Sequence, residues 1–192
     1  MKIKKYFSAT FFISIAVMTF NYSAFSQVKY YKGYVILING DTLKGEIKKN
    51  PKNEFDNFRK AVYRKGEGLP MKSYGAEKVK EYNIDGDIFL SRMIEDEAVF
   101  VKRILVGTYN LYEAQIETMQ SNKITAETAY FIEKSGSTDL IKIIEKSSKF
   151  KKQMMDIMSD NKDIVKALEA EKYTYKNITE LFEAYNKSAK TN

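Results

Sequence analysis

Between residues 29 and 145 the sequence is a succession of short apolar runs separated by turn-forming residues. This pattern is typical of antiparallel β-strands joined by tight turns. We therefore expect about nine strands in this part of the chain. They are predicted at residues 34–38, 42–49, 59–65, 79–84, 87–94, 98–106, 109–116, 128–134 and 139–145.

The first two predicted strands flank a glycine-rich stretch, "GYVILINGDTLKGEI" at residues 33–47. A phosphate-binding P-loop requires Lys and then Ser or Thr after its second glycine. Gly40 and Gly45 have the P-loop spacing, but Glu46 and Ile47 occupy those two positions. Asn-Gly between two apolar runs instead favours a β-hairpin, and we expect a type I′ turn at residues 39–40.

The other connections are polar. Residues 50–57 are predicted to form a loop, and residues 118–127 a longer loop that could act as a flap. "NIDGD" at residues 83–87 resembles a fragment of a calcium loop, but Asp-Gly favours a simple turn and the remaining ligands of such a loop are missing. The run Glu95-Asp96-Glu97 could supply acid–base carboxylates, although a solvated turn is favoured.

After residue 145 the periodicity becomes helical. Phe150, Met154, Ile157 and Met158 share one helix face, so a helix is expected to begin near residue 147 or 148. A second helix is predicted over residues 163–170, with Asp163 as a candidate N-cap. A third is predicted from Asn177, with Glu180 completing a capping box. We expect the apolar stripes of these helices to pack on the sheet.

These elements together predict an α+β fold. It consists of an antiparallel β-sheet curled into a roll or open barrel, about nine strands in all, followed by about three C-terminal helices. The expected organisation is a signal peptide at residues 1–26, an antiparallel β domain at 27–145 and a helical segment at 146–192.

Residues 1–26 have the features of an export signal. Lys2, Lys4 and Lys5 precede an apolar run at residues 8–20, and small residues at Ala24 and Ser26 form a cleavage site. No later segment is apolar enough to cross a membrane as a helix. We expect a soluble protein of the periplasm or the outer-membrane periphery, or an extracellular one.

The absence of two residue types restricts the chemistry. The sequence contains neither cysteine nor histidine. Thiol nucleophiles, Ser-His-Asp machinery, imidazole ligands and thiolate metal sites are therefore excluded. Carboxylate, lysine or tyrosine chemistry and oxygen-bound hard cations remain. We expect no enzymatic activity, no cofactor and no metal site.

Charge and aromatic residues give weak binding signals. Removing the signal leaves 29 basic and 25 acidic residues, a net charge of +4, so no nucleic-acid partner is expected. "KYYKGY" at residues 29–34 places Tyr30, Tyr31 and Tyr34 near the start of the sheet. These three tyrosines are the candidate surface residues, and Tyr30, Tyr31 or Tyr34 could serve as a stacking platform for a carbohydrate.

Three segments resemble a family of exported proteins common in Bacteroidetes. They are "KGYVILINGDTLKGEI" (32–47), "KVKEYNIDGDIFL" (78–90) and "FVKRILVGTYNLYEA" (100–114), and "ITELFEAYN" (178–186) is similar to the family's closing helix. The matching positions are turns and core residues. The resemblance therefore implies a location in the cell envelope and assigns no active site.

The sequence predicts a non-enzymatic exported envelope protein that works as a binding or interaction module, with another envelope or outer-membrane protein as its partner. Two alternatives remain open at this point. One is a small-ligand carrier with an apolar pocket inside the β-roll. The other is an envelope enzyme that uses carboxylates.

Overall fold

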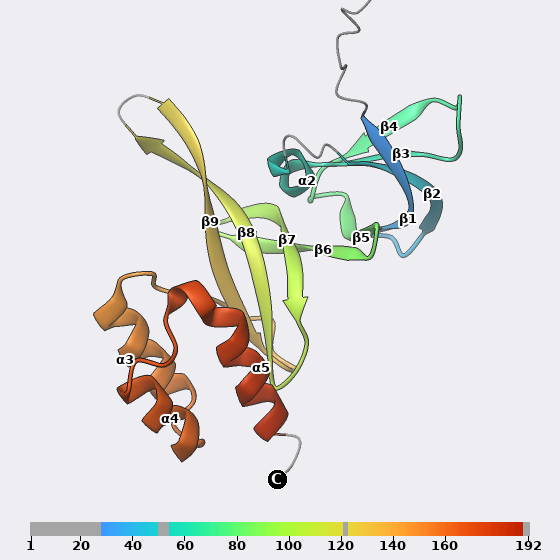
Figure 1. Cartoon of the computed structure of the whole chain (residues 1–192). Helices are drawn as coiled ribbons and strands as arrows, with labels where there is room; N and C mark the ends of the chain where they lie inside the picture. The colour runs from blue at the N-terminus through green and yellow to red at the C-terminus, as the bar shows by residue number, and fades with distance from the viewer. Residues whose placement is uncertain (1–27, 50–53, 121–122, 190–192) are drawn as a thin grey trace, which may run out of the picture.

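The computed structural model describes residues 28–49, 54–120 and 123–189, which form one ten-stranded antiparallel sheet and several helices (Figure 1). The strand order is β10-β9-β8-β7-β6-β5-β1-β2-β3-β4. The strands are β1 (Lys29–Leu37), β2 (Thr42–Lys49), β3 (Ala61–Arg64), β4 (Met71–Tyr74), β5 (Val79–Ile84), β6 (Asp87–Ile94), β7 (Glu97–Leu105), β8 (Tyr109–Gln120), β9 (Lys123–Lys134) and β10 (Leu140–Lys142). The helices are α2 (Phe55–Arg59), α3 (Ser147–Ile157), α4 (Lys162–Glu169), the 3₁₀ turn η1 (Tyr175–Asn177) and α5 (Ile178–Ser188).

The predicted α+β class with a large antiparallel sheet is confirmed, and each of the nine predicted strands corresponds to a strand of the structure. The tenth strand, β4, was not predicted, because it is an exposed edge strand that has no alternation of buried and exposed residues. The predicted loop at residues 118–127 is wrong for residues 118–120 and 123–127, which are strand, and residues 121–122 lie outside the described part of the chain. β8 and β9 continue as paired strands as far as Gln120 and Lys123.

The interval before β3 also differs from the prediction. Residues 55–57, expected in a loop, belong to helix α2, and Arg59, expected in a strand, ends that helix. Phe58 is buried and meets Phe89 of β6 edge-on, with 5.2 Å between the ring centroids. Burial of this aromatic residue against the sheet explains why a helix too short to be stable alone forms here. Residues 50–53 lie outside the described part of the chain.

The first hairpin is confirmed, but its predicted type I′ turn is wrong. Gly40 has a φ of 91°, whereas Asn39 is not among the residues with positive φ. The Gly40 N–H donates to the Leu37 carbonyl at 2.9 Å, which makes a three-residue loop with the glycine in the left-handed position. Two-residue turns with both residues at positive φ occur instead at 85–86 and 95–96.

The two faces of the sheet carry different hydrophobic cores. In β6, Phe89 belongs to one hydrophobic core and its neighbour Leu90 packs against another, and β7 divides in the same way between Phe100 and Val101. The first core lies under α2 in the half of the sheet that contains β1, β2 and β3. The second lies on the other face of β7–β9, where β10 comes within 8 Å of β6 without hydrogen-bonding to it. The sheet is therefore curled but open.

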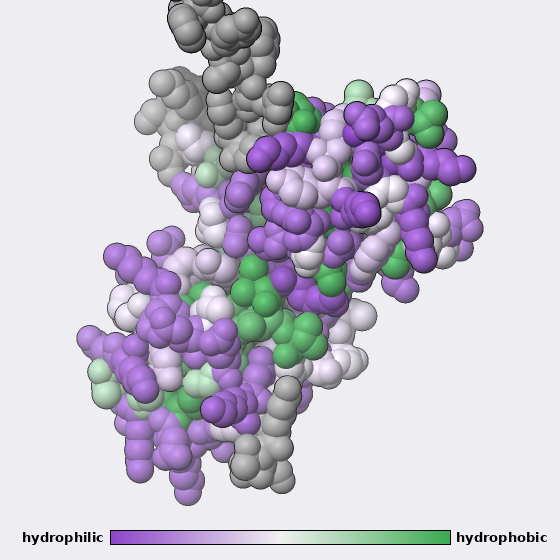
Figure 2. All heavy atoms as spheres, turned by 45° about the vertical axis from the view of Figure 1, so that its right-hand side comes forward, coloured by the Kyte–Doolittle hydropathy of each residue, from purple (hydrophilic) through white to green (hydrophobic). Residues whose placement is uncertain are grey.

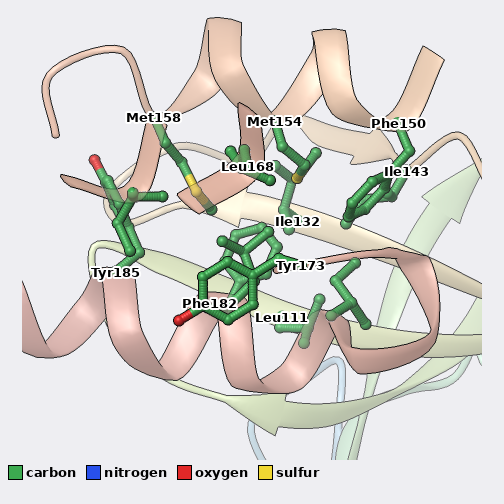
Figure 3. Packing of buried hydrophobic residues seen from close by; sticks show 13 residues of the cluster. Leu111, Ile132, Ile143, Phe150, Met154, Met158, Leu168, Tyr173, Phe182 and Tyr185 are labelled. Carbon is green, nitrogen blue, oxygen red and sulfur yellow. The ribbon is translucent and has the colours of Figure 1, made fainter. Parts of the chain in front are cut away.

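A third core joins the C-terminal helices to the outer face of β8 and β9 (Figure 3). Met154, Met158 and Phe182 pack with Leu111 and Ile132 of the sheet. The apolar stripes of the helices therefore serve this core rather than an exposed surface.

Helix capping differs in detail from the prediction. The N-cap of α4 is Asn161, whose side chain accepts the Ile164 N–H at 3.1 Å, rather than Asp163. The capping box lies one turn earlier than predicted, between Thr174 and Asn177 of η1.

The face of the molecule seen in Figure 2 is mainly polar, and a group of hydrophobic side chains is visible near the middle of the view. No helix formed by the described residues has the length and apolar character needed to cross a membrane. The predicted export signal lies outside the described ranges.

Candidate binding cleft between β7 and β8

β7 and β8 are paired over only part of their length. Their register includes Lys102 opposite Glu113, Arg103 opposite Tyr112 and Leu105 opposite Leu111, and the ladder ends at the first of these pairs. Beyond it β7 stays paired with β6, whereas β8 continues with β9 as a long hairpin that leaves the body of the sheet (Figure 1). A cleft opens where the two strands part.

The main-chain groups that face this cleft follow from strand alternation. The Ser135 N–H donates to the Thr108 carbonyl at 2.9 Å, so the even-numbered residues of β8 exchange hydrogen bonds with β9. The N–H and C=O groups of Gln115 and Glu117 therefore point toward β7. By the same alternation Ala98 of β7 points toward β8. Within the described ranges no backbone hydrogen bond joins these groups to another strand.

The cleft has a volume of about 460 Å³ and is bounded by α2, the β6–β7 turn and β8. This volume lies within the range of ligand sites. The lining residues are Phe55, Phe58, Arg59, Ile94, Glu95, Glu97, Ala98, Val99, Ala114, Gln115, Ile116 and Glu117. They combine an apolar floor with three carboxylates and one guanidinium.

Arg59 is the one cation among the described residues that line the cleft, and it is already engaged. Arg59 Nη1 lies 3.5 Å from Glu117 Oε1, and the guanidinium sits 5.5 Å from the centre of the Phe55 ring. Both partners of this ion pair are largely exposed, so it contributes little to stability. Glu95 and Glu97 form no ion pair with any described residue, and the cleft carries a net negative charge.

A polar network of Arg92, Tyr112 and Glu133 lies on the inner face of the curled half of the sheet and fixes its curvature. Arg92 Nη2 donates to Glu133 Oε2 at 3.2 Å, and Arg92 Nε lies 3.2 Å from Glu133 Oε1 without hydrogen-bonding geometry. The Tyr112 hydroxyl donates to Glu133 Oε2 at 2.6 Å. Burial alone would raise the pKa of Glu133, but the hydrogen bonds from Tyr112 and Arg92 hold it below the ordinary glutamate value.

A second charged cluster lies on the other face, between the core under α2 and the core under the C-terminal helices. Lys102 Nζ lies 2.9 Å from Asp87 Oδ1, and Lys49 Nζ lies 3.3 Å from Asp87 Oδ2. Burial opposes ionisation of Asp87, yet the two lysines lower its pKa. Burial raises the pKa of Glu113, which is opposite Lys102 in the ladder. These side chains tie β2, β6 and β7 together.

The three predicted tyrosines do not share one face. Tyr30 and Tyr34 lie on one side of β1 and Tyr31 on the other, where it packs against the core under α2. Tyr30 lies under the Arg64 guanidinium at 3.7 Å. The Tyr34 hydroxyl donates to Glu81 Oε1 at 2.5 Å, and burial together with this bond raises the pKa of Tyr34 to about 12. A stacking platform made of all three rings is not formed.

The predicted acidic residues are placed differently from one another. Glu95 and Asp96 form the turn between β6 and β7, as expected, and Glu95 and Glu97 line the cleft. Asp87 of the "NIDGD" segment faces two lysines, while Asn83 is on the opposite face of the sheet. Among the described residues, no group of three or more acidic side chains is positioned to hold a metal ion.

The interior of the curled half is filled by side chains. Val101, Tyr112 and Phe131 are at most 3% exposed and occupy the inner face of β7–β9. A ligand inside the roll would have to displace them.

The cleft has no signal in the amino-acid sequence. The segments 98–106 and 109–116 read as an ordinary hairpin across Gly107, with no residue type that signals where pairing ends. The end of the pairing depends on the packing of α2 and on the curvature held by Arg92 and Glu133, and neither was predicted.

Comparison with models of known protein families, with curated proteins and with solved structures gave no significant match. The candidate site therefore rests on the geometry of this chain alone.

Proposed function

We propose that the protein is an exported, non-enzymatic interaction module of the cell envelope that binds another envelope protein at the β7–β8 cleft. The observation that carries this proposal is the parting of the two strands. It leaves the main-chain groups of Gln115, Glu117 and Ala98 directed into a concave surface of ligand-site size. Strand edges of this kind are recognition surfaces for other polypeptides.

The remaining chemistry of the chain favours binding over catalysis. Without cysteine or histidine, the groups left for catalysis are carboxylates, lysines and tyrosines. The two carboxylates with lowered pKa values, Glu133 and Asp87, are held by Arg92 and by two lysines in structural ion pairs outside the cleft. A location in the envelope is supported by the export-signal features of residues 1–26 and by the resemblance to exported Bacteroidetes proteins.

The carrier alternative is less well supported. A carrier needs a largely apolar cavity, and the inner face of β7–β9 is filled by Val101, Tyr112 and Phe131.

The proposal is tested by fractionating cells that produce the tagged protein and by purifying the complexes it forms. We expect the protein in the envelope fraction, with an envelope partner that is retained by the surface variant Glu67→Gln and lost from Gln115→Pro. Recovery in the cytoplasm would overturn the proposal. So would a hydrolytic activity on envelope glycans or peptides that Glu95→Gln or Asp96→Asn abolishes.

A further inference from the structure

We propose that the β7–β8 cleft takes an extended, basic segment of the partner, which adds to the free edge of β8 as an extra strand. This inference rests on the proposed function, because it states what the interaction module recognises. Three observations support it: the free main-chain groups of β8, the negative charge of the cleft, and the poorer fit of a second copy of this chain.

The edge of β8 already has the extended conformation that pairing requires in the protein without a partner. From Ala114 to Gln120 the strand is held in extended form by β9, opposite Ala129 and Lys123 at the two ends. Alternate residues present an N–H and a C=O on the outer side. Binding therefore costs only the conformational entropy of ordering the incoming segment. The N–H and C=O groups of that segment hydrogen-bond to those of β8.

The charge of the cleft selects among extended segments. Among the described residues that line it, Glu95, Glu97 and Glu117 stand against one cation, the Arg59 guanidinium. Alternate residues of a strand point to the same side, so lysines or arginines at every second position would bring several cations to these carboxylates. A segment with glutamates at the same positions would be repelled.

A second copy of this chain fits the cleft less well. Pairing through its own β8 would add another Glu117 to the three carboxylates already present, and its edge strands β10 and β4 are only three and four residues long, with one lysine each. Like charges across an interface oppose association. The occupant is therefore assigned to a different, basic polypeptide.

The test uses the purified protein and three short synthetic peptides in calorimetric titrations. The first alternates lysine and threonine, the second alternates glutamate and threonine, and the third is the lysine peptide with alternate amides N-methylated. We expect binding of the lysine peptide that weakens as salt is added. The N-methylated peptide should bind about tenfold more weakly or not at all, because it has lost main-chain donors. The glutamate peptide should not bind.

Protein variants locate the binding surface. Glu97→Gln and Glu117→Gln should each weaken the lysine peptide roughly threefold, whereas Glu67→Gln in the β3–β4 turn should not. Gln115→Pro should abolish binding and remain folded, since its N–H faces the cleft and not β9. If Gln115→Pro does not fold, the N-methylated peptide still decides the question.

Two results would overturn the inference. One is equal affinity for the lysine peptide and either of the other peptides. The other is a homodimer, detected by sedimentation, that Gln115→Pro dissociates, because the edge would then belong to a second copy. If the peptides fail but the protein still recovers an envelope partner that Gln115→Pro loses, the proposed function stands and only this inference falls.

Discussion

Arg92 on β6 and Glu133 on β9 form an ion pair across the two strands that separate them in the sheet order, with 3.2 Å between Nε and Oε1. Such a contact requires β6 and β9 to bend toward each other over the same face. The Tyr112 hydroxyl, from the intervening strand β8, donates to the same carboxylate. This network holds the curled half of the sheet in shape while β7 and β8 part beside it.

Replacing Arg92 with Met should lower the free energy of unfolding by about 3 kcal/mol, because Glu133 would remain buried without its cation. Chemical denaturation measures this loss. The double variant Arg92→Met with Glu133→Gln should recover part of it, since the uncompensated charge is then removed. The exposed cation Arg59 is the control, and Arg59→Met should change stability by less than about 1 kcal/mol. Equal effects of the two single variants would contradict the role given to the network.

Acid should destabilise the fold partly through Glu133. Because the folded state lowers its pKa below the ordinary value of 4.5, its contribution is present above that value and is lost as the pH falls through the folded-state pKa. Glu133→Gln should therefore show a shallower loss of unfolding free energy in acid than the parent protein. Burial raises the pKa of Glu113, so protonation of Glu113 in acid stabilises the folded state. Glu113→Gln removes this gain and should therefore steepen the loss of unfolding free energy in acid. Parallel acid profiles for all three proteins would show that neither carboxyl is linked to folding.

Base should destabilise the fold through tyrosines with raised pKa values, among them Tyr34 and Tyr185. Burial and hydrogen bonds to Glu81 and Asp160 raise the pKa of Tyr34 and of Tyr185 to about 12. The neutral phenols stabilise the folded state fully below pH 10.0, the ordinary pKa of tyrosine. This stabilisation is lost as the pH rises toward 12. Spectrophotometric titration of Tyr34→Phe should show one fewer late-ionising tyrosine than the parent. An unchanged number of late-ionising groups would mean that Tyr34 does not hold its proton in this way.

Gly33 is required by the close approach of β1 and β5. A Cβ atom at this position would lie 2.1 Å from the Asn83 carbonyl oxygen, so the two strands would have to separate. Gly33→Ala should therefore cost about 2 kcal/mol or more of unfolding free energy. At Gly66 the nearest atom to an added Cβ would be Leu69 Cδ1 at 3.9 Å, and Gly66→Ala serves as the matched control. If Gly33→Ala left the free energy of unfolding almost unchanged, β1 and β5 would have to lie farther apart than described.

Local periodicity predicted most of the fold, because strands and helices that bury one face carry that face in their sequence. β5 and β6 were predicted at their observed bounds, and the stripe of Phe150 and Met154 identified α3. Elements fixed by tertiary contacts were missed. α2 depends on the burial of Phe58, and β4 is an edge strand with little buried surface.

The candidate site was less predictable than the fold. Glu95 and Glu97 were recognised as acidic residues at a turn, but their grouping with Glu117 and Arg59 depends on where β7 leaves β8. That point is set by the packing of α2 and by curvature held by Arg92 and Glu133. Both are contacts between residues distant in sequence, which periodicity does not report.

The central claim is that β8 offers a free edge in the cleft, and amide hydrogen exchange tests it most directly. Ala114 and Ile116 pair with Ala129 and Glu127 of β9, whereas the N–H groups of Gln115 and Glu117 face the cleft. Without a partner, the amides of Gln115 and Glu117 should exchange about a hundredfold faster than those of Ala114 and Ile116. Saturation with the lysine–threonine peptide should slow the first two amides and leave the other two unchanged. Equal protection of all four without peptide, or no slowing on its addition, would contradict the account.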